Sequence, residues 1–205
     1  MLHKQMGKYI STELMNNPSK KKIELYQEEK EYIEKYELIP DDITFIEKDP
    51  TTRFLEAYIE RCDKETEEML SKESFRFLEN SIVYLQKHKN EFLYFESQWF
   101  EKIGVDGISF EVNDVFGTYF VMVGLKLPKK NGPSLKENLT KELDGDVAKY
   151  ELMFNQNDGL WDLNFALNYV NGFNEQMSLE EAFRLIYRFL FNLVESVEER
   201  SKNVN

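Results

Sequence analysis

Cysteine, histidine, glycine and proline are all scarce in this chain of 205 residues. A single cysteine cannot form a disulfide within the chain, which fits a reducing compartment. With that cysteine and only two histidines, the chain lacks the several closely spaced ligands that a zinc site needs. The nine glycines form neither a GxGxxG nor a GxxxxGK motif, so we expect no nucleotide binding through a standard phosphate loop.

Long apolar runs are missing as well. None approaches the ~20 residues that a membrane-spanning helix needs. The first ten residues show neither the apolar core nor the small-residue cleavage site of a secretory signal. We therefore expect a cytoplasmic protein that does not contact a membrane.

Basic residues are also fewer than acidic ones. The chain has 26 lysines and arginines against 38 aspartates and glutamates, a formal net charge of −12. Most of this acidic excess lies in residues 23–101, which contain ten basic and twenty-one acidic residues. Such a charge repels phosphate backbones, so no nucleic-acid partner is expected. Two interpretations stay open: solvated helix faces that keep the protein soluble, or a surface for a basic protein partner.

Groups suited to catalysis or metal binding are hard to find. His3 lies near the end of the chain and His88 lies in a lysine-rich stretch, so neither is expected to be a general base. Cys62 has no histidine beside it in sequence and is predicted to be a buried apolar residue. The stretches 144–146 and 155–159 have calcium-like compositions without the spacing of an EF-hand, and we interpret both as turns. No catalytic residue can be named.

The chain does have ample material for a core, since 41% of its residues are hydrophobic and 14% are aromatic. In the first half the apolar residues recur with helical spacing. That spacing predicts helices over residues 2–16, 19–36, 50–70 and 72–103, with breaks at 40–42 and near His88. Asp49 is expected to cap the third helix, and Phe92, Phe95 and Trp99 to share one face of the fourth.

At Gly104 the pattern changes to strict alternation, which is typical of strands. Two hairpins are predicted, over residues 108–127 and 150–169, each followed by a helix, at 134–143 and 179–197. Ser178 and Glu181 form a capping box before the last helix. We predict one α+β domain, with a helical part (1–103) and a ββαββα part (104–201) that forms a mostly antiparallel four-stranded sheet packed by helices.

Seven residues are candidates for binding a ligand or a partner. The polar positions of the second hairpin, at Asp162, Asn164 and Asn168, form either a solvated surface or a binding face. Large aromatic side chains could form the walls of a pocket between the helical part and the sheet. These are Trp99, Tyr119, Trp161 and Tyr169.

The last helix is apolar on more than one side, because Phe189 and Phe191 lie away from its main stripe. Two interpretations stay open for this second side. It is either buried between two layers of the same chain, or it forms the interface of a homodimer.

Three stretches resemble a family of short proteins from Bacillus-type bacteria. They are PTTRFLEAYIERCDKETEE (50–68), residues 88–127 with GVDG and DVFGTY, and LMFNQNDGLWDLNFAL (152–167). Members of this family are often labelled branched-chain amino acid aminotransferases. The resemblance covers most of the chain and implies a pyridoxal-phosphate enzyme, but it assigns no role to a particular residue here.

Two functional hypotheses follow. The first is a protein that is not an enzyme, uses no cofactor and binds a protein partner, in the manner of a chaperone or an immunity protein. The second is a small-ligand-binding domain or enzyme, whose named form is the pyridoxal-phosphate branched-chain amino acid aminotransferase.

Overall fold

A seven-stranded antiparallel sheet organises the molecule. The computed structural model describes residues 1–205 except 17–21, 40–42, 114, 144–148 and 204–205. The strand order in the sheet is β4-β3-β5-β6-β7-β9-β8. The strands are β3 (Tyr58–Asp63), β4 (Met69–Glu73), β5 (Glu91–Glu96), β6 (Val105–Val112), β7 (Tyr119–Leu125), β8 (Tyr150–Asn155) and β9 (Leu160–Ala166).

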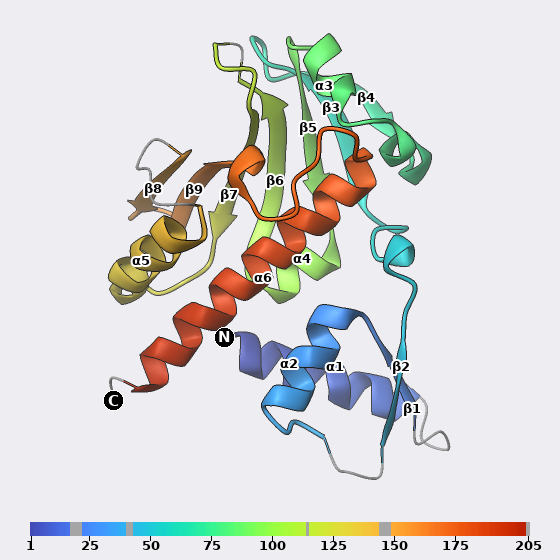
Figure 1. Cartoon of the computed structure of the whole chain (residues 1–205), viewed down its shortest axis with the longest axis vertical. Helices are drawn as coiled ribbons and strands as arrows, with labels where there is room; N and C mark the ends of the chain where they lie inside the picture. The colour runs from blue at the N-terminus through green and yellow to red at the C-terminus, as the bar shows by residue number, and fades with distance from the viewer. Residues whose placement is uncertain (17–21, 40–42, 114, 144–148, 204–205) are drawn as a thin grey trace.

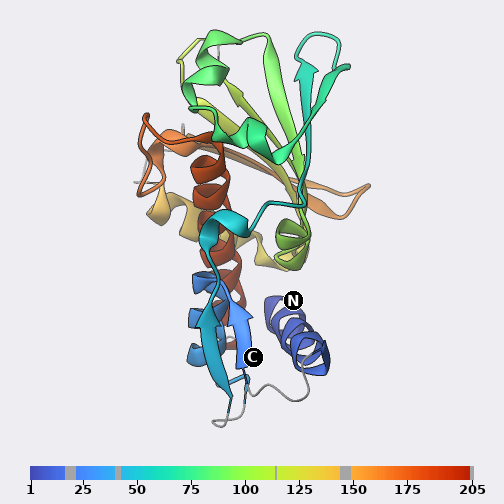
Figure 2. The ribbon, with the colours of Figure 1, turned by 90° about the vertical axis from the view of Figure 1, so that its right-hand side faces the viewer.

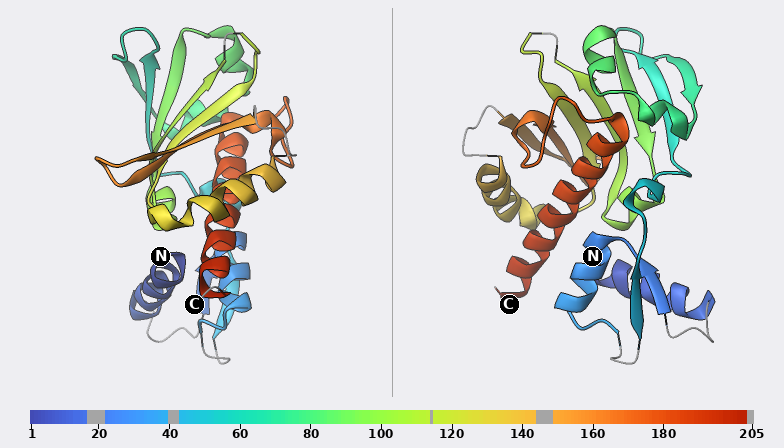
Figure 3. Two further views of the ribbon diagram at one scale, coloured as in Figure 1. Left: turned by 90° about the vertical axis from the view of Figure 1, so that its left-hand side faces the viewer. Right: turned by 45° about the vertical axis from the view of Figure 1, so that its right-hand side comes forward.

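The longest helix, α6 (Leu179–Asn203), crosses one face of this sheet diagonally and extends beyond it (Figure 1). Helix α5 (Gly132–Glu142) lies on the same side as α6 (Figure 3). Two short helices, α3 (Val83–Lys87) and α4 (Gln98–Lys102), flank β5 in sequence. Short 3-10 turns complete the connections, at Pro50–Thr52, Phe75–Glu79, Lys129–Asn131 and Leu167–Tyr169.

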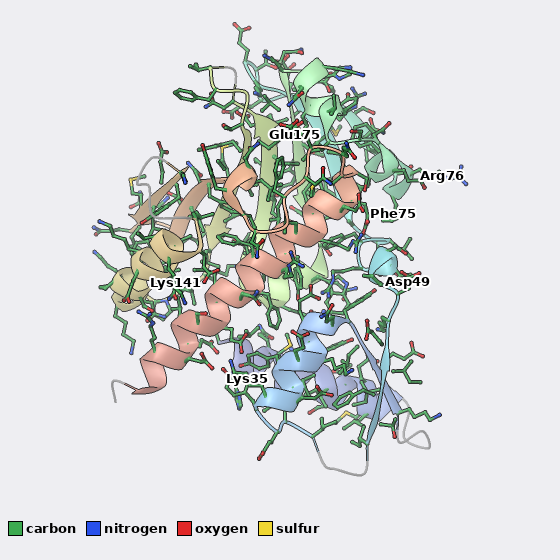
Figure 4. The ribbon with its side chains drawn as sticks, in the orientation of Figure 1. Lys35, Asp49, Phe75, Arg76, Lys141 and Glu175 are labelled. Carbon is green, nitrogen blue, oxygen red and sulfur yellow. The ribbon has the colours of Figure 1, made fainter. Side chains whose placement is uncertain are left out.

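The described elements between Leu2 and Glu47 form a small layer, called here the N-terminal layer, beside the C-terminal half of α6 (Figure 1). It contains α1 (Leu2–Asn16), β1 (Lys22–Leu25), α2 (Gln27–Lys35) and β2 (Thr44–Glu47), and β1 pairs with β2 in parallel. Lys35 of α2 forms ion pairs with Glu195 and Glu199 of α6, both at 2.8 Å, and lies beside that helix in Figure 4. The last helix therefore joins the N-terminal layer to the sheet.

The sheet is apolar on the face that α6 covers. Alternate residues of its central strands point to this face, and Phe95, Phe110 and Phe165 are completely buried there. Phe95 stacks on Phe183 of α6 with ring centres 4.0 Å apart. This alternation is the signature of an antiparallel sheet with one face packed on a core.

The prediction of an α+β fold is confirmed, but the sheet is larger than predicted. It has seven strands rather than four, because three strands come from the part of the chain predicted to be helical. The predicted helix over 50–70 is wrong: after a 3-10 turn this segment forms β3 and β4. The predicted helix over 72–103 is also wrong, since strand β5 lies between α3 and α4. The predicted boundary at residue 103 falls between two paired strands, β5 and β6.

These errors have a common physical cause. Strand β5 (EFLYFE) carries large apolar residues on both faces, so its period of two is hidden and a helical period fits it equally well. Phe92 and Phe95 therefore lie on opposite faces of a strand instead of one face of a helix. Cys62 is buried as predicted, but on strand β3.

Several other predictions are confirmed. The helix over 2–16, the two hairpins and the helix near 134–143 are all present. The predicted helix over 19–36 is wrong in its first part, since Lys22–Leu25 form β1 and only Gln27–Lys35 form a helix, α2. Ser178 and Glu181 form the capping box, with each backbone N–H donating to the other side chain at 2.8 and 3.1 Å. The breaks predicted at 40–42 and the turn at 144–146 lie outside the described residues. Residues 167–169 form a 3-10 turn rather than the end of a strand.

Phe189 and Phe191 are both buried within the chain. Phe189 packs against Phe165 of β9, with ring centres 4.7 Å apart, and Phe191 packs against Tyr32 of α2, at 5.8 Å. Both side chains are therefore buried between layers of the same chain, as the first of the two interpretations expects. In the part of the chain that the structure describes, no helix is long and apolar enough to span a membrane.

Candidate functional site

The second face of the seven-stranded sheet, called here the outer face, is not covered by a helix among the described residues. In the side views, α5 and α6 lie on one side of the strands, and the other side is open (Figures 2 and 3). The side chains on this side are mostly half-buried or exposed. Antiparallel sheets often leave one face to solvent, but such a face is then normally polar.

One row of side chains crosses all seven strands of the outer face. The register of the strands makes neighbours of Lys72, Glu60, Tyr94, Ser109, Met122, Asn164 and Glu151, in that order. Since neighbouring strands lie ~4.8 Å apart, six steps span about 29 Å. The row joins acidic groups near the two edges of the sheet to apolar groups at its centre.

Large apolar side chains extend from the middle of the outer face to its β8 edge. Phe92, Phe120 and Met122 are half-buried, and Met153 is 66% exposed. The ring of Tyr94 lies over Gly107, where a Cβ atom would come within 2.8 Å of the phenol oxygen. A glycine at this position lets the aromatic ring lie flat along the sheet.

The carboxylates of the outer face mostly lack a cationic partner. Among the described residues, none of Glu60, Glu96, Glu151 and Asp162 forms an ion pair. Neutral groups donate to three of them: Tyr58 to Glu60, Tyr94 to Glu96 at 2.5 Å and the Asn164 amide to Glu151 at 3.4 Å. The four carboxylates thus have no direct contact with a cation among the described residues, although Lys72 is the cross-strand neighbour of Glu60.

This negative potential acts on the weak acids beside it. The hydrogen bond to Glu60 raises the pKa of Tyr58 above its ordinary value. Burial, and then the charge of Glu60, raises the pKa of the Cys62 thiol. Burial and the hydrogen bond to Glu96 raise the pKa of Tyr94 to about 12. In all three cases a nearby carboxylate opposes the formation of a second negative charge.

An exposed apolar pair marks the turn of the β6–β7 hairpin. Val115 and Phe116 are 81% and 79% exposed. The Asn113 side chain accepts hydrogen bonds from both backbone N–H groups, at 3.0 and 3.1 Å, and Gly117 has a φ of 64°. The hydrogen bonds between the Asn113 side chain and the backbone thus hold the turn. The two apolar side chains, Val115 and Phe116, remain in solvent.

Two of the seven predicted candidates, Asp162 and Asn164, lie on the outer face, both half-buried. Asn168 lies beyond the end of β9, where its side chain accepts a hydrogen bond from the Tyr119 N–H at 2.7 Å. Tyr169 is 43% exposed, and Lys149 lies over its ring at 4.2 Å. Asn168 thus joins the turn after β9 to the first residue of β7.

The aromatic candidates do not come together as the walls of one pocket. Trp99 packs against Tyr9 and Tyr26 of the N-terminal layer. Tyr119 is buried beside Phe110 and Phe173, and Trp161 packs against Phe154. Their rings have separate neighbours in three different parts of the core.

A buried charge cluster lies where the N-terminal layer meets α6. Arg53 donates to both oxygens of Glu29, at 2.8 and 3.0 Å, and to Glu28 at 2.5 Å. Its guanidinium lies 4.2 Å from the ring centre of Tyr26 and 4.1 Å from that of Tyr187. Burial raises the pKa of Tyr187 well above its ordinary value, and the Glu29 charge adds to this effect. The phenol therefore stays protonated and donates its hydrogen bond to Glu29.

A polar cleft of about 580 Å³ opens beside this cluster. Arg53, Arg184 and Arg188 line it together with Glu28 and Glu181. The arginines already have partners: Arg184 pairs with Glu180 at 2.7 Å, and Arg188 donates to the Asn171 carbonyl at 3.3 Å. The cleft is thus lined mainly by polar and charged groups.

Binding of pyridoxal phosphate in the cleft would need a lysine whose amino group can form a Schiff base. Lys48 lines the cleft, but its Nζ lies 5.5 Å from the ring centre of Tyr26 and 6.0 Å from that of Trp99. It also donates to Tyr9 Oη at 3.5 Å. The amino group is thus held among aromatic rings.

No metal centre or histidine site is formed by the described residues. Among them, no three His, Cys, Asp or Glu side chains are grouped so as to hold a metal ion. His88 stacks on Tyr84 with ring centres 4.0 Å apart. Asn155 Oδ1 accepts from the N–H groups of Asn157 and Asp158, at 3.0 and 3.4 Å, so the stretch 155–159 is the predicted turn.

Sequence patterns alone do not reveal Glu60, Tyr94 and Met122 as members of one surface. The apolar spacing predicts Glu60 and Tyr94 on two different helices, and only the register of β3, β5 and β6 brings them together. The sequence does indicate part of this surface in the second hairpin, where Asp162 and Asn164 alternate with apolar residues.

Comparison of the chain with family models, curated proteins and solved structures finds no match.

Proposed function

We propose that this chain acts without catalysis, by binding a protein partner on the outer face of its sheet. Binding of this kind is what a chaperone-like or immunity-type protein does when it masks part of another protein. The resemblance to the Bacillus-type family does not identify any residue of this surface as functional. The proposal rests on the chemistry and exposure of the outer face.

One observation carries the proposal, the row from Lys72 to Glu151. Solvated sheet faces carry mainly small polar and charged groups, and contiguous exposed apolar groups commonly mark interaction sites. Here Tyr94 and Met122 lie at the centre of the row, with Phe92 and Phe120 beside it. Aromatic residues and methionine are enriched in the cores of protein interfaces, and polar groups form the rim.

Affinity capture with a matched pair of variants tests the proposal. The tagged wild-type chain is compared with Met122→Lys, which places a charge at the centre of the outer face. The control is Thr12→Lys, at an exposed position of α1 with the same change in charge. We expect the wild type and Thr12→Lys to retain one partner in stoichiometric amount, and Met122→Lys to lose it.

Two results would count against the proposal. One is that no stoichiometric partner is retained by any of the three proteins. The other is that Met122→Lys and the wild type retain the same partner equally. Thermal unfolding of both variants shows whether the fold is intact, which is required for the comparison.

The polar cleft supports a second candidate function, the binding of a small polar ligand between the N-terminal layer and α6. A cleft of about 580 Å³ is within the usual range for a small-molecule site. A thermal-shift screen with amino acids, including branched-chain ones, and with pyridoxal phosphate tests it. A ligand at a hundredfold excess over its Kd stabilises the native state by about 2.7 kcal/mol. A flat screen removes this candidate.

A further inference from the structure

Building on the proposed function, we propose that the partner presents a basic segment, rich in arginine and lysine, which lies across the strands along the row from Glu60 to Glu151. The outer face thus selects its partner by charge as well as by apolar contact.

The first argument is the excess of unpaired carboxylates. Glu60, Glu96, Glu151 and Asp162 have no ion pair among the described residues, whereas Glu111 pairs with Lys64 at 3.3 Å. Burying a carboxylate without a counter-charge is costly, so an apolar or acidic partner would incur a desolvation penalty at four positions. A basic partner removes that penalty by supplying the missing cations.

The second argument is that the aromatic groups between these carboxylates suit arginine. A guanidinium can bind a carboxylate through two parallel hydrogen bonds and can also stack on an aromatic ring. Tyr94 offers its ring beside Glu96, and Phe92 and Phe120 lie next to the row. Lys72 already forms a cation–π contact on this face, because its Nζ lies 4.6 Å from the ring centre of Tyr58.

The third argument is the dimension of the row. Five steps between neighbouring strands separate Glu60 from Glu151, about 24 Å, which corresponds to roughly seven residues of extended chain. An octa-arginine peptide can therefore reach from the Glu60 side to the Glu151 side. It serves as a defined probe for the chemistry of the outer face.

The methionines provide well-placed reporters for this probe. Met122 lies at the centre of the outer face and Met153 near its β8 edge, whereas Met15 is 77% exposed on α1 and Met177 is buried near the cleft. In the full chain labelled with ¹³C at the methionine methyl groups, octa-arginine is titrated at about 0.15 M ionic strength, where the Debye length is about 8 Å. We expect the signals of Met122 and Met153 to shift and those of Met15 and Met177 to stay.

Two sets of substitutions with equal changes in charge separate a specific site from general attraction. The outer-face set is Glu60→Gln, Glu151→Gln and Asp162→Asn. The control set is Glu31→Gln, Glu34→Gln and Glu142→Gln, at exposed positions of α2 and α5. We expect Kd for the peptide to rise about tenfold in the outer-face set, since each lost pair costs a fraction of a kcal/mol. The control set should change Kd less than about twofold, because distant charges are screened.

Three results would overturn the inference: no binding, shifts at Met15 or Met177 instead of Met122 and Met153, or equal weakening by both sets. These outcomes differ from a failure of the proposed function. If a captured partner still depends on Met122 while octa-arginine does not bind the outer face, the face is used and only its basic specificity is wrong.

Discussion

Arg53 holds both carboxylate oxygens of Glu29 inside the protein, at 2.8 and 3.0 Å, with only 2% and 0% of the two side chains exposed. The contact joins the segment before β3 to α2. Tyr187 of α6 completes the arrangement by donating a hydrogen bond to Glu29. Three distant parts of the sequence therefore depend on one buried ion pair.

The first prediction concerns this pair. Arg53→Met leaves the Glu29 charge buried without a partner, and we expect it to lower the free energy of unfolding by about 3–5 kcal/mol. Adding Glu29→Gln should restore part of the loss, because the uncompensated charge is then gone. Lys35→Met removes a more exposed ion pair and should cost less than about 1 kcal/mol. Urea unfolding of the four proteins measures these differences, and equal losses in Arg53→Met and Lys35→Met would contradict the assignment.

The second prediction uses two glycines with opposite surroundings. A Cβ atom at Gly132, the first residue of α5, would lie 2.6 Å from Cη2 of Trp161, which is 8% exposed. Gly132→Ala should therefore destabilise the protein by about 1–3 kcal/mol through overpacking. At Gly7, within α1, a Cβ atom meets nothing within 4 Å, so Gly7→Ala should stabilise by about 0.5–1 kcal/mol. Urea unfolding measures the change in the free energy of unfolding for each variant. A change of the same sign in both variants would contradict the prediction.

The third prediction concerns the start of α6. The Ser178 hydroxyl accepts from the Glu181 N–H at 3.1 Å, so Ser178→Ala should cost about 1 kcal/mol. Ser178→Asn, which can still accept this hydrogen bond, should cost much less. Thermal unfolding of both variants is the measurement, and an equal loss would show that the cap contributes nothing specific.

The fourth prediction is a pH dependence. The pKa of Tyr94 is about 12 in the native protein, because of burial and the hydrogen bond to Glu96, and about 10 in an unfolded chain. The native state therefore keeps a proton that the unfolded chain loses, and stability should fall as the pH rises from about 10 to about 12. Tyr119, with a pKa raised by burial to about 12, acts in the same direction. Urea unfolding across this range should show a shallower fall for Tyr94→Phe, and an unchanged slope would contradict the burial of the phenol.

Sequence patterns are informative where their periodicity is unambiguous. Alternation in residues 108–112 and 119–125 predicts both strands of the first hairpin, and Ser178 with Glu181 predicts the start of the last helix. In these segments one face is apolar and the other polar, so only one period fits. The same alternation in the second hairpin predicts a polar face that carries Asp162 and Asn164.

Sequence patterns fail where both faces of a strand are apolar or where charges obscure the alternation. In β3 (YIERCD), Ile59 is buried on the inner face and Cys62 on the outer face, which imitates the spacing of a helix. The complete row from Lys72 to Glu151 could not be predicted, because it depends on pairings between residues distant in sequence, such as Glu60 with Tyr94 and Met122 with Asn164. Local patterns carry no information on such registers.

The most direct test of the central claim is to label carboxylates in the free chain and in its complex with the captured partner. Carbodiimide-activated labelling, read by mass spectrometry, reports each carboxylate separately. We predict that binding protects Glu60, Glu96, Glu151 and Asp162, and leaves the labelling of Glu31, Glu34 and Glu142 unchanged. Protection of the second group, with the first still labelled as in the free chain, would show that the partner binds elsewhere.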